Sequence, residues 1–140
     1  MRIFLDANIL VAVINKEYPL FTYASRIVSL ADSKQHEVFT SPLCLAIAFY
    51  FAEKKNKKTA KNKIKILSAN LSIAGVNSDT VQKTVQNSAI NDFEDGLEYY
   101  AAVESKCKCI ITEDKDDFYF SDIEVLDCGE FFNKYMVKKG

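Results

Sequence analysis

Short apolar runs alternate with longer amphipathic stretches along this chain, and that alternation constrains its fold more than any other feature. Runs typical of buried strands lie at residues 2–5, 38–39, 71–76, 107–112 and 123–127. Stretches with apolar residues at helical spacing separate them. Strands that alternate with helices indicate a largely parallel sheet with helices on both faces. Because no repeat, linker or low-complexity segment interrupts the 140 residues, we expect a single α/β domain over 1–140.

Capping residues mark the starts of several expected helices. Ser41, with a proline directly after it, predicts the start of a helix that runs to about residue 55. Ser78 or Asp79 is expected to cap a later helix, and Asn91 or Asp92 the one that follows it. Asn8 is expected near the cap of the first helix.

Composition narrows the setting in which the chain works. No apolar run approaches the roughly 20 residues that span a bilayer, and the start lacks the basic end and apolar stretch of a signal peptide. We therefore expect a cytoplasmic protein. Cys107 and Cys109 are one residue too close for a CxxC pair, and His36 is the single histidine, so a structural zinc site is disfavoured.

Charge is unevenly distributed although the formal net charge is −1. Residues 54–65 hold seven lysines and no acid, whereas residues 92–117 hold nine acidic residues and three lysines. A lysine-rich helix is ordinarily a solvated face, yet a phosphate backbone requires such a patch. Helical spacing places Lys58, Lys61 and Lys65 on a shared basic stripe that is a candidate nucleic-acid contact.

Several acids are expected to meet at one edge of the sheet. Asp6 follows the first strand among apolar neighbours, where an unpaired carboxylate is costly. Asp114 closely follows the strand at 107–112, and Asp117 lies three residues further on. The carboxyl ends of parallel strands share one edge, which is where ligands bind in open sheets. Clustered carboxylates bind Mg²⁺ or Mn²⁺, and such ions can promote phosphodiester hydrolysis.

Each acid also has a purely structural interpretation. Asp92 and Asp95 lie three residues apart at a helix start, where they could serve only as a cap and as compensation for the helix dipole. Asp116 is expected in an exposed turn. The aromatic residues Phe49 and Tyr50 are expected in the core rather than as platforms for bases.

Four segments resemble the motifs of PIN-domain proteins, including the toxin ribonucleases of bacterial toxin–antitoxin pairs. These are "FLDANIL", "TSPLCLAIAFYF", "DFEDGLEYYAAVESKCKCIIT" and "TEDKDDF", in the family's order and spacing. The resemblance implies a three-layer α/β/α sandwich with a parallel five-stranded sheet. It also implies an endoribonuclease that depends on Mg²⁺ or Mn²⁺ and has an antitoxin as a partner, and it leaves a homodimer open.

The resemblance assigns roles to individual residues. Asp6, Asp95 and Asp114 would be catalytic and would hold the metal together with Asp117; the supporting polar residues would be Asn8, Asp92 and Thr112. One position departs from the family, because Ile47 stands where the second motif usually has a glutamate. Glu53 lies six residues further along the same helix, about 9 Å along its axis, and is a poor substitute.

Two alternatives remain beside a metal-dependent ribonuclease. A PIN-like domain with weakened chemistry could bind nucleic acid or protein without cutting, and Ile47 favours this interpretation. A receiver-like or phosphatase-like domain would also use aspartates at strand ends. A receiver needs paired acids after its first strand, however, and "FLDANIL" supplies one.

Overall fold

The computed structural model describes residues 1–137, so the last three residues of the domain predicted over 1–140 lie outside it. Five strands form one sheet in the order β3-β2-β1-β4-β5, and every neighbouring pair is parallel. The strands are β1 (Arg2–Leu5), β2 (Glu37–Thr40), β3 (Ser72–Ile73), β4 (Cys109–Ile111) and β5 (Glu124–Leu126). The predicted five-stranded parallel sheet is confirmed.

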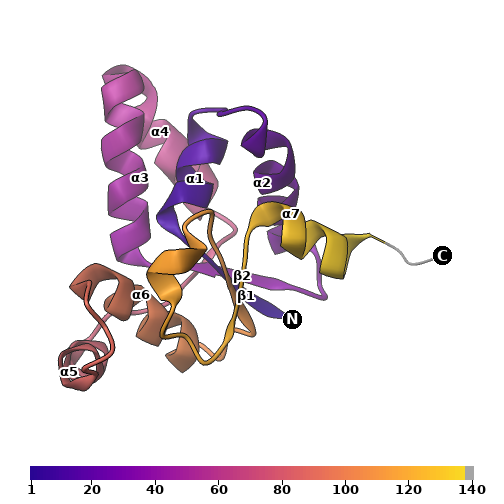
Figure 1. The fold of residues 1–140 in the computed structure, drawn as a ribbon. Coiled ribbons are helices and arrows are strands. Elements are labelled where there is room, and N and C mark those ends of the chain that lie inside the picture. The colour runs from indigo at the N-terminus through magenta and orange to yellow at the C-terminus, as the bar shows by residue number, and fades with distance from the viewer. Residues whose placement is uncertain (138–140) are drawn as a thin grey trace.

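Helices cover both faces of this sheet. They are α1 (Ala7–Ile14), α2 (Leu20–Val28), α3 (Pro42–Lys55), α4 (Lys57–Ser68), α5 (Ser78–Gln86), α6 (Phe93–Glu104) and α7 (Cys128–Phe131). Figure 1 shows α1 to α4 gathered on one side of β1 and β2, with α5 and α6 on the other. The predicted three-layer arrangement is therefore confirmed. No helix within residues 1–137 has the length and apolar character needed to cross a membrane.

Some of the helix caps predicted from the sequence agree with the structure, and others differ from it. Ser41 caps α3 as predicted, its Oγ accepting a hydrogen bond from the backbone N–H of Cys44 at 3.1 Å. The predicted cap of α5 at Ser78 or Asp79 is wrong. Asn77 occupies that position in a reciprocal capping box with Thr80, which holds the start of the helix one residue earlier.

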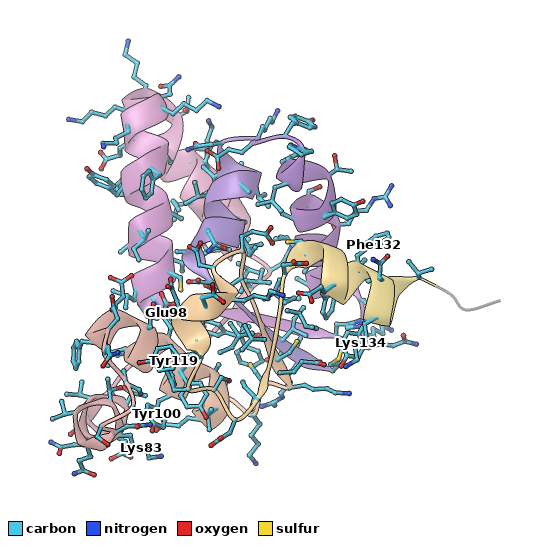
Figure 2. All side chains as sticks on the ribbon, viewed as in Figure 1. Lys83, Glu98, Tyr100, Tyr119, Phe132 and Lys134 are labelled. Carbon is cyan, nitrogen blue, oxygen red and sulfur yellow. The ribbon has the colours of Figure 1, made fainter. Side chains whose placement is uncertain are left out.

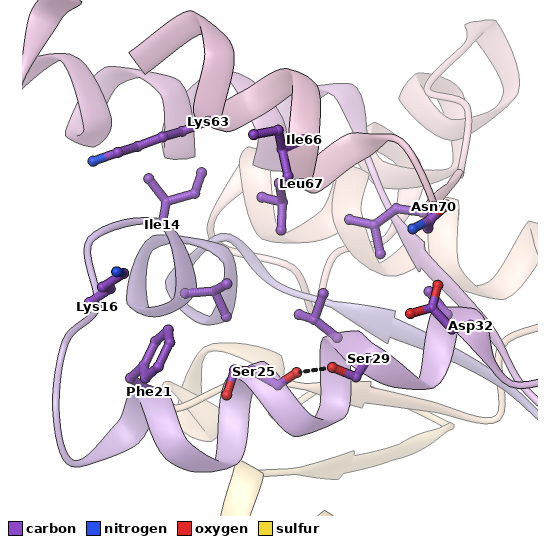
Figure 3. Close-up of a pocket in the computed structure, with 14 residues that line it drawn as sticks. Ile14, Lys16, Phe21, Ser25, Ser29, Asp32, Lys63, Ile66, Leu67 and Asn70 are labelled. Atoms are coloured by element: carbon purple, nitrogen blue, oxygen red, sulfur yellow. Dashed lines mark hydrogen bonds between the residues drawn. The ribbon is translucent and has the colours of Figure 1, made fainter. Parts of the chain in front are cut away.

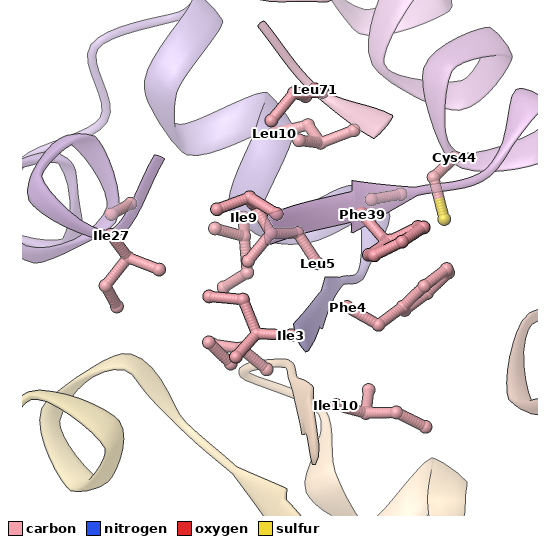
Figure 4. Close-up of a cluster of buried hydrophobic side chains, with 14 of the residues drawn as sticks. Ile3, Phe4, Leu5, Ile9, Leu10, Ile27, Phe39, Cys44, Leu71 and Ile110 are labelled. Atoms are coloured by element: carbon pink, nitrogen blue, oxygen red, sulfur yellow. The ribbon is translucent and has the colours of Figure 1, made fainter. Parts of the chain in front are cut away.

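The core is centred on β1. Ile3, Phe4 and Leu5 are completely buried, because helices cover both faces of this central strand. Figure 4 shows them packed with apolar residues from α1, α2 and the neighbouring strands, among them Ile9, Ile27 and Ile110. The first strand is therefore an anchor from which the residues that follow it project in a fixed direction.

The chain reverses its direction across the sheet at β1. It runs from β1 to β2 on one side, and only later returns to β4 on the other. Leu5 is paired with Ile111, so these two central strands end at the same level. The backbone N–H of Asp6 donates to the carbonyl of Ile111 at 3.0 Å. This is the switch point of an open parallel sheet, where a ligand crevice is expected.

Candidate active site

Asp6 is held at the switch point from two directions. It is the N-cap of α1, with Oδ1 accepting from the N–H of Ala7 at 2.7 Å. Its other oxygen, Oδ2, accepts from the hydroxyl of Thr112 at 2.8 Å. Only 8% of the residue is exposed, so these donors replace much of the water that the carboxylate loses. Asp6 therefore caps the helix that was expected to start near Asn8.

The Asn8 amide links the ends of β1 and β4. Its Nδ2 lies 3.0 Å from Thr112 Oγ1, 3.2 Å from Asp114 Oδ2 and 3.4 Å from Asp6 Oδ2. Its Oδ1 accepts from the N–H of Glu113 at 3.2 Å. The two predicted supporting residues, Asn8 and Thr112, thus lie between the two acids and fix their separation.

The predicted acids meet in one crevice of about 420 Å³. The polar residues that line it are Asp6, Asn8, Glu17, Glu94, Asp95, Asp114 and Asp117. They come from segments at opposite ends of the sequence. Convergence of Asp6, Asp95 and Asp114 was the central geometric expectation from the sequence, and the structure shows it.

Asp92 has a different position from the other predicted acids. Its Oδ1 accepts from the N–H groups of Glu94 at 3.0 Å and Asp95 at 3.4 Å, so it is the N-cap of α6. It is not among the residues that line the crevice. The structural interpretation therefore holds for Asp92, whose capping bonds direct the first turn of α6 and with it the crevice residue Asp95.

The crowding of negative charges in the crevice helps to raise the pKa values of two of its acids. Burial, and then the charges of Asp92 and Asp117, raise the pKa of Asp95 to about 7. Burial and the charge of Asp114 raise the pKa of Asp117. A divalent cation relieves repulsion of this kind, and carboxylate oxygens are the ligands that Mg²⁺ and Mn²⁺ prefer. The residues present therefore fit such an ion, with Asp6, Asp95, Asp114 and Asp117 as its candidate ligands.

Glu98 is a functional candidate that the sequence interpretation missed. It lies on α6 with 2% of its surface exposed, and Oε1 accepts from the Cys44 thiol at 3.1 Å. One potential ligand atom from each of Asp6, Cys44 and Glu98 lies within 4.8 Å of the others. Figure 2 shows Glu98 near the end of α3 that faces α6. A second buried carboxyl group therefore lies directly behind Asp6.

The surroundings of the Glu98 carboxyl favour its protonated form. Burial, followed by the charge of Asp6 and hydrogen bonding to it, raises the pKa of Glu98 to about 10. Burial and the charge of Glu98 also raise the pKa of the Cys44 thiol well above its usual value. Both groups keep their protons, so this trio is a hydrogen-bonded support for Asp6. The sequence does contain one signal that could have identified Glu98. It lies three residues after Asp95 and therefore on the same face of the helix.

The lysine stripe lies elsewhere on the surface. Lys58, Lys61 and Lys65 are exposed on α4, and none of them lines the crevice described above. Ile47 does line it, on the α3 wall, whereas Glu53 does not. The expectation that Tyr50 belongs to the core is wrong, since 53% of the residue is exposed, whereas Phe49 is partly buried and packs against the core.

A second cavity, of about 400 Å³, opens on another side of α1. Figure 3 shows it between Ile14 and Phe21 on one side and Ile66 and Leu67 of α4 on the other. Its lining is mainly apolar, and Asp32 is its one carboxylate among the residues described. A single carboxylate cannot reproduce the chemistry of the acidic crevice, so the crevice is the candidate active site.

The parallel sheet and the carboxylates at its switch point define an α/β protein with a strand-end site suited to a divalent cation. A family model described as "PIN domain" matches residues 2–116. This chain belongs to the PIN domain family. The match includes three of the four crevice aspartates and ends one residue before the fourth, Asp117.

Known relatives extend over nearly the whole chain. Ribonuclease VapC1 of Aquifex aeolicus (strain VF5) is 28% identical over 138 residues, which cover 96% of this chain and 95% of the relative. The crystal structure of VapBC2 from Rickettsia felis, bound to a DNA fragment from its promoter, matches with a TM-score of 0.70 at 20% identity, covering 91% of this chain and 98% of that one. VapC20 of Mycobacterium tuberculosis, a sarcin-ricin loop cleaving toxin, matches with a TM-score of 0.67 at 20% identity, covering 88% and 98%. The two solved structures establish the shared fold.

Proposed function

We propose that this protein is an endoribonuclease that hydrolyses RNA phosphodiester bonds with the help of Mg²⁺ or Mn²⁺. The observation that carries the proposal is the convergence of Asp6, Asp95, Asp114 and Asp117 on one crevice. Membership of the PIN domain family and similarity to a ribonuclease that spans nearly the whole chain support it. The similarity in fold to an RNA-cleaving toxin is consistent with it.

Each residue has a defined task in this mechanism. Thr112 and the helix cap hold Asp6 in one orientation, and the Asn8 amide holds Asp114 beside it. Asp95 becomes a strong oxygen ligand when it loses its proton. A divalent cation held by these oxygens would supply activation of water and stabilisation of the leaving oxygen. The neutral Glu98 supports Asp6 without adding another negative charge.

We also propose that the protein is the toxin of a pair and is restrained by an antitoxin. The Rickettsia felis structure contains two named proteins bound to DNA from their promoter, which supports a partner of this kind. A cytoplasmic location, in which the protein would meet RNA, stays a prediction. A homodimer also stays a prediction.

One observation favours a second function. Ile47 lies on the crevice wall, at the position where the resemblance leads us to expect a carboxylate. An apolar side chain cannot bind a cation, so the site would have one ligand fewer. The alternative is a PIN domain that binds nucleic acid or protein without cutting it.

Mn²⁺ titration together with RNA cleavage separates these functions. Wild-type protein is expected to bind Mn²⁺ by calorimetry and to shorten a mixed RNA substrate. Asp6→Asn and Asp95→Asn are expected to lose cleavage by at least a hundredfold, because each removes a charged ligand from the crevice. Asp116→Asn is the matched control, since Asp116 is exposed and lies outside the crevice lining.

The outcomes of these measurements separate a ribonuclease from a binding module. Cleavage that persists in Asp6→Asn at the wild-type rate would contradict the assignment of the site. RNA binding without any cleavage across Mg²⁺ and Mn²⁺ would support the binding module. Thermal unfolding of every variant shows whether lost activity reflects lost structure.

A further inference from the structure

One wall of the acidic crevice is apolar. Val11 of α1 and Ile47 and Phe51 of α3 line the same cavity as the carboxylates. Ile47 and Phe51 are four residues apart, so they lie on one face of α3. Phe51 is 42% exposed although it is a large aromatic residue. The crevice therefore combines charged oxygens with an accessible ring.

A second ring and positive charge lie beside Phe51 on α3. The ring of Tyr50 meets that of Phe51 edge to face, with centroids 5.3 Å apart, and 53% of Tyr50 is exposed. The Lys54 ammonium lies 5.0 Å from the centroid of the Tyr50 ring. Lys55 is fixed close by, where its Nζ donates to the carbonyl of Asn15 at 2.5 Å.

The order of these groups matches the order of groups along a single nucleic-acid strand. The carboxylates and their cation are suited to a phosphate, the ring to the flat face of a base, and a lysine to the next phosphate. Proteins that hold single strands combine stacking on aromatic side chains with positive charge along the backbone. The accessible ring adjoins the site of the proposed chemistry, so a base of the bound RNA is the occupant that the arrangement favours.

We propose that Phe51, together with Ile47, is the stacking platform for the nucleobase beside the cleaved bond, and that Lys54 receives the adjacent phosphate. This inference rests on the proposed function and adds a residue that selects how the substrate is seated. Ile47 then has a positive role, since an apolar side chain at this position extends the platform. Stacking also makes cleavage dependent on an unpaired strand, because a base within a duplex cannot reach the ring.

Fluorescence of 2-aminopurine tests stacking directly. Short single-stranded RNAs, each with one 2-aminopurine at a different position, are titrated with wild-type protein in Ca²⁺, which takes oxygen ligands like those in the crevice. At one position the fluorescence is expected to be quenched on binding. Phe51→Leu is expected to abolish that quenching and to weaken binding by about five- to tenfold, at the lower end of what stacking contributes.

Three further variants make the result specific. Phe51→Trp is expected to restore the quenching, because a flat ring returns. Tyr23→Leu is the matched control, since Tyr23 is also 42% exposed but lies on α2 outside the crevice lining. It is expected to bind RNA as the wild type does. Lys54→Ala is expected to weaken binding about twofold to fivefold while leaving the quenching of bound RNA intact.

Wild-type quenching and affinity in Phe51→Leu would overturn the proposal. So would a dimer that Phe51→Leu converts to monomer with no change in RNA affinity, because the ring would then face a second copy. These results do not depend on cleavage. Quenching that requires Phe51 in a protein that never cuts RNA would retain the platform and reject the nuclease.

Discussion

Two carboxyl groups one helical turn apart on α6 have different environments and different tasks. Asp95 faces the crevice and has a pKa of about 7, whereas Glu98 is buried behind Asp6 and has a pKa of about 10. Burial is the largest cause in both cases. Near neutral pH the first group can lose its proton to accept a cation, and the second keeps its proton.

Metal binding is expected to follow the protonation of Asp95. The protonated acid is a poor ligand, so Mn²⁺ affinity should rise by up to about tenfold per pH unit below pH 7 and level off above it. Calorimetric titration between pH 5.5 and 8.5 measures this. Asp95→Asn should bind more weakly and lose most of the pH dependence in this range. A wild-type profile that is flat across pH 7 would contradict the role of Asp95.

Glu98 is expected to make folding stability depend on pH. Its folded-state pKa of about 10 lies above the usual 4.5, so the folded protein holds a proton that the unfolded chain has released. Its contribution is fully present below pH 4.5 and is lost as pH rises towards 10, by about 1.4 kcal/mol per pH unit. Urea denaturation at several pH values should show a smaller slope for Glu98→Gln, which cannot ionise.

A matched control accompanies this comparison. Glu53→Gln makes the same chemical change on α3, outside the crevice lining, and should keep the wild-type slope. Equal slopes for wild type and Glu98→Gln would show that Glu98 is ionised in the folded protein. In that case it would be an additional candidate ligand rather than a neutral support.

The sequence was sufficient to find the acids that directly follow strands, and it missed the one that is buried in a helix. Asp6 and Asp114 were found because parallel strands place their carboxyl ends at one edge. Glu98 was missed because a glutamate between apolar residues on a helix is usually on the solvent side. Only the packing of α3 against α6 reveals that it lies beside Cys44.

The placement of α6 depends on a close approach to α5. A Cβ atom added at Gly96 would clash with Cγ2 of Thr84 and would lie 3.0 Å from a methyl group of Ile90. Thr84 is buried, and its hydroxyl donates to the carbonyl of Thr80 at 2.7 Å. The absence of a side chain at Gly96 therefore allows α5 and α6 to pack closely against each other.

Gly96→Ala is expected to destabilise the protein. Alanine gains about 1 kcal/mol of helix propensity, but overpacking typically costs about 1–3 kcal/mol, so a net loss of about 1 kcal/mol is expected. Denaturant unfolding measures the change. In the double variant Thr84→Ala/Gly96→Ala, the smaller side chain at position 84 leaves room for the new methyl group at position 96. The double variant should therefore lose less stability than the two single variants lose together. Strict additivity would contradict the close contact.

At the scale of elements, long helices were easier to predict than short strands and exact caps. The cap at Ser41 and the proline after it were sufficient to place α3. The strand expected at 71–76 is only Ser72–Ile73, because it lies at the edge of the sheet and pairs with β2 alone. The cap of α5 moved to Asn77 because three neighbouring residues could each supply a capping oxygen.

Over the whole molecule, positive and negative charge occupy different regions. Lys58, Lys61 and Lys65 lie on α4 outside the crevice lining, so an RNA that contacts them would have to extend beyond the proposed cleavage site. Replacing all three with alanine is expected to weaken RNA binding at low salt and to reduce the slope of log affinity against log salt by about 2.

A variant in which the same three lysines are replaced with arginine is the control for this charge effect. It keeps three positive charges on the same helix, so the salt slope should remain that of the wild type. An unchanged slope in the alanine triple variant would show that the stripe is an ordinary solvated face. Fluorescence anisotropy of a labelled single-stranded RNA measures both variants.

The fold as a whole was more predictable than its details. Alternation of strands and helices was enough for the parallel sheet, and the five apolar runs agreed with the number of strands that the resemblance implied. The site followed from the sheet for Asp6 and Asp114, and the resemblance supplied the supporting residues Asn8 and Thr112. What the sequence could not supply was the second cavity beside α1 and the exposure of Tyr50, since both depend on how helices pack.

The crevice joins residues that are far apart in the order of synthesis. Thr112 donates to Asp6 across 106 positions, and β1 has β4 as a direct neighbour. A nascent chain that has released only its first hundred residues from the ribosome therefore has Asp6 and Asp95 but lacks Thr112, Asp114 and Asp117. Synthesis must pass Asp117 before the four crevice aspartates can meet.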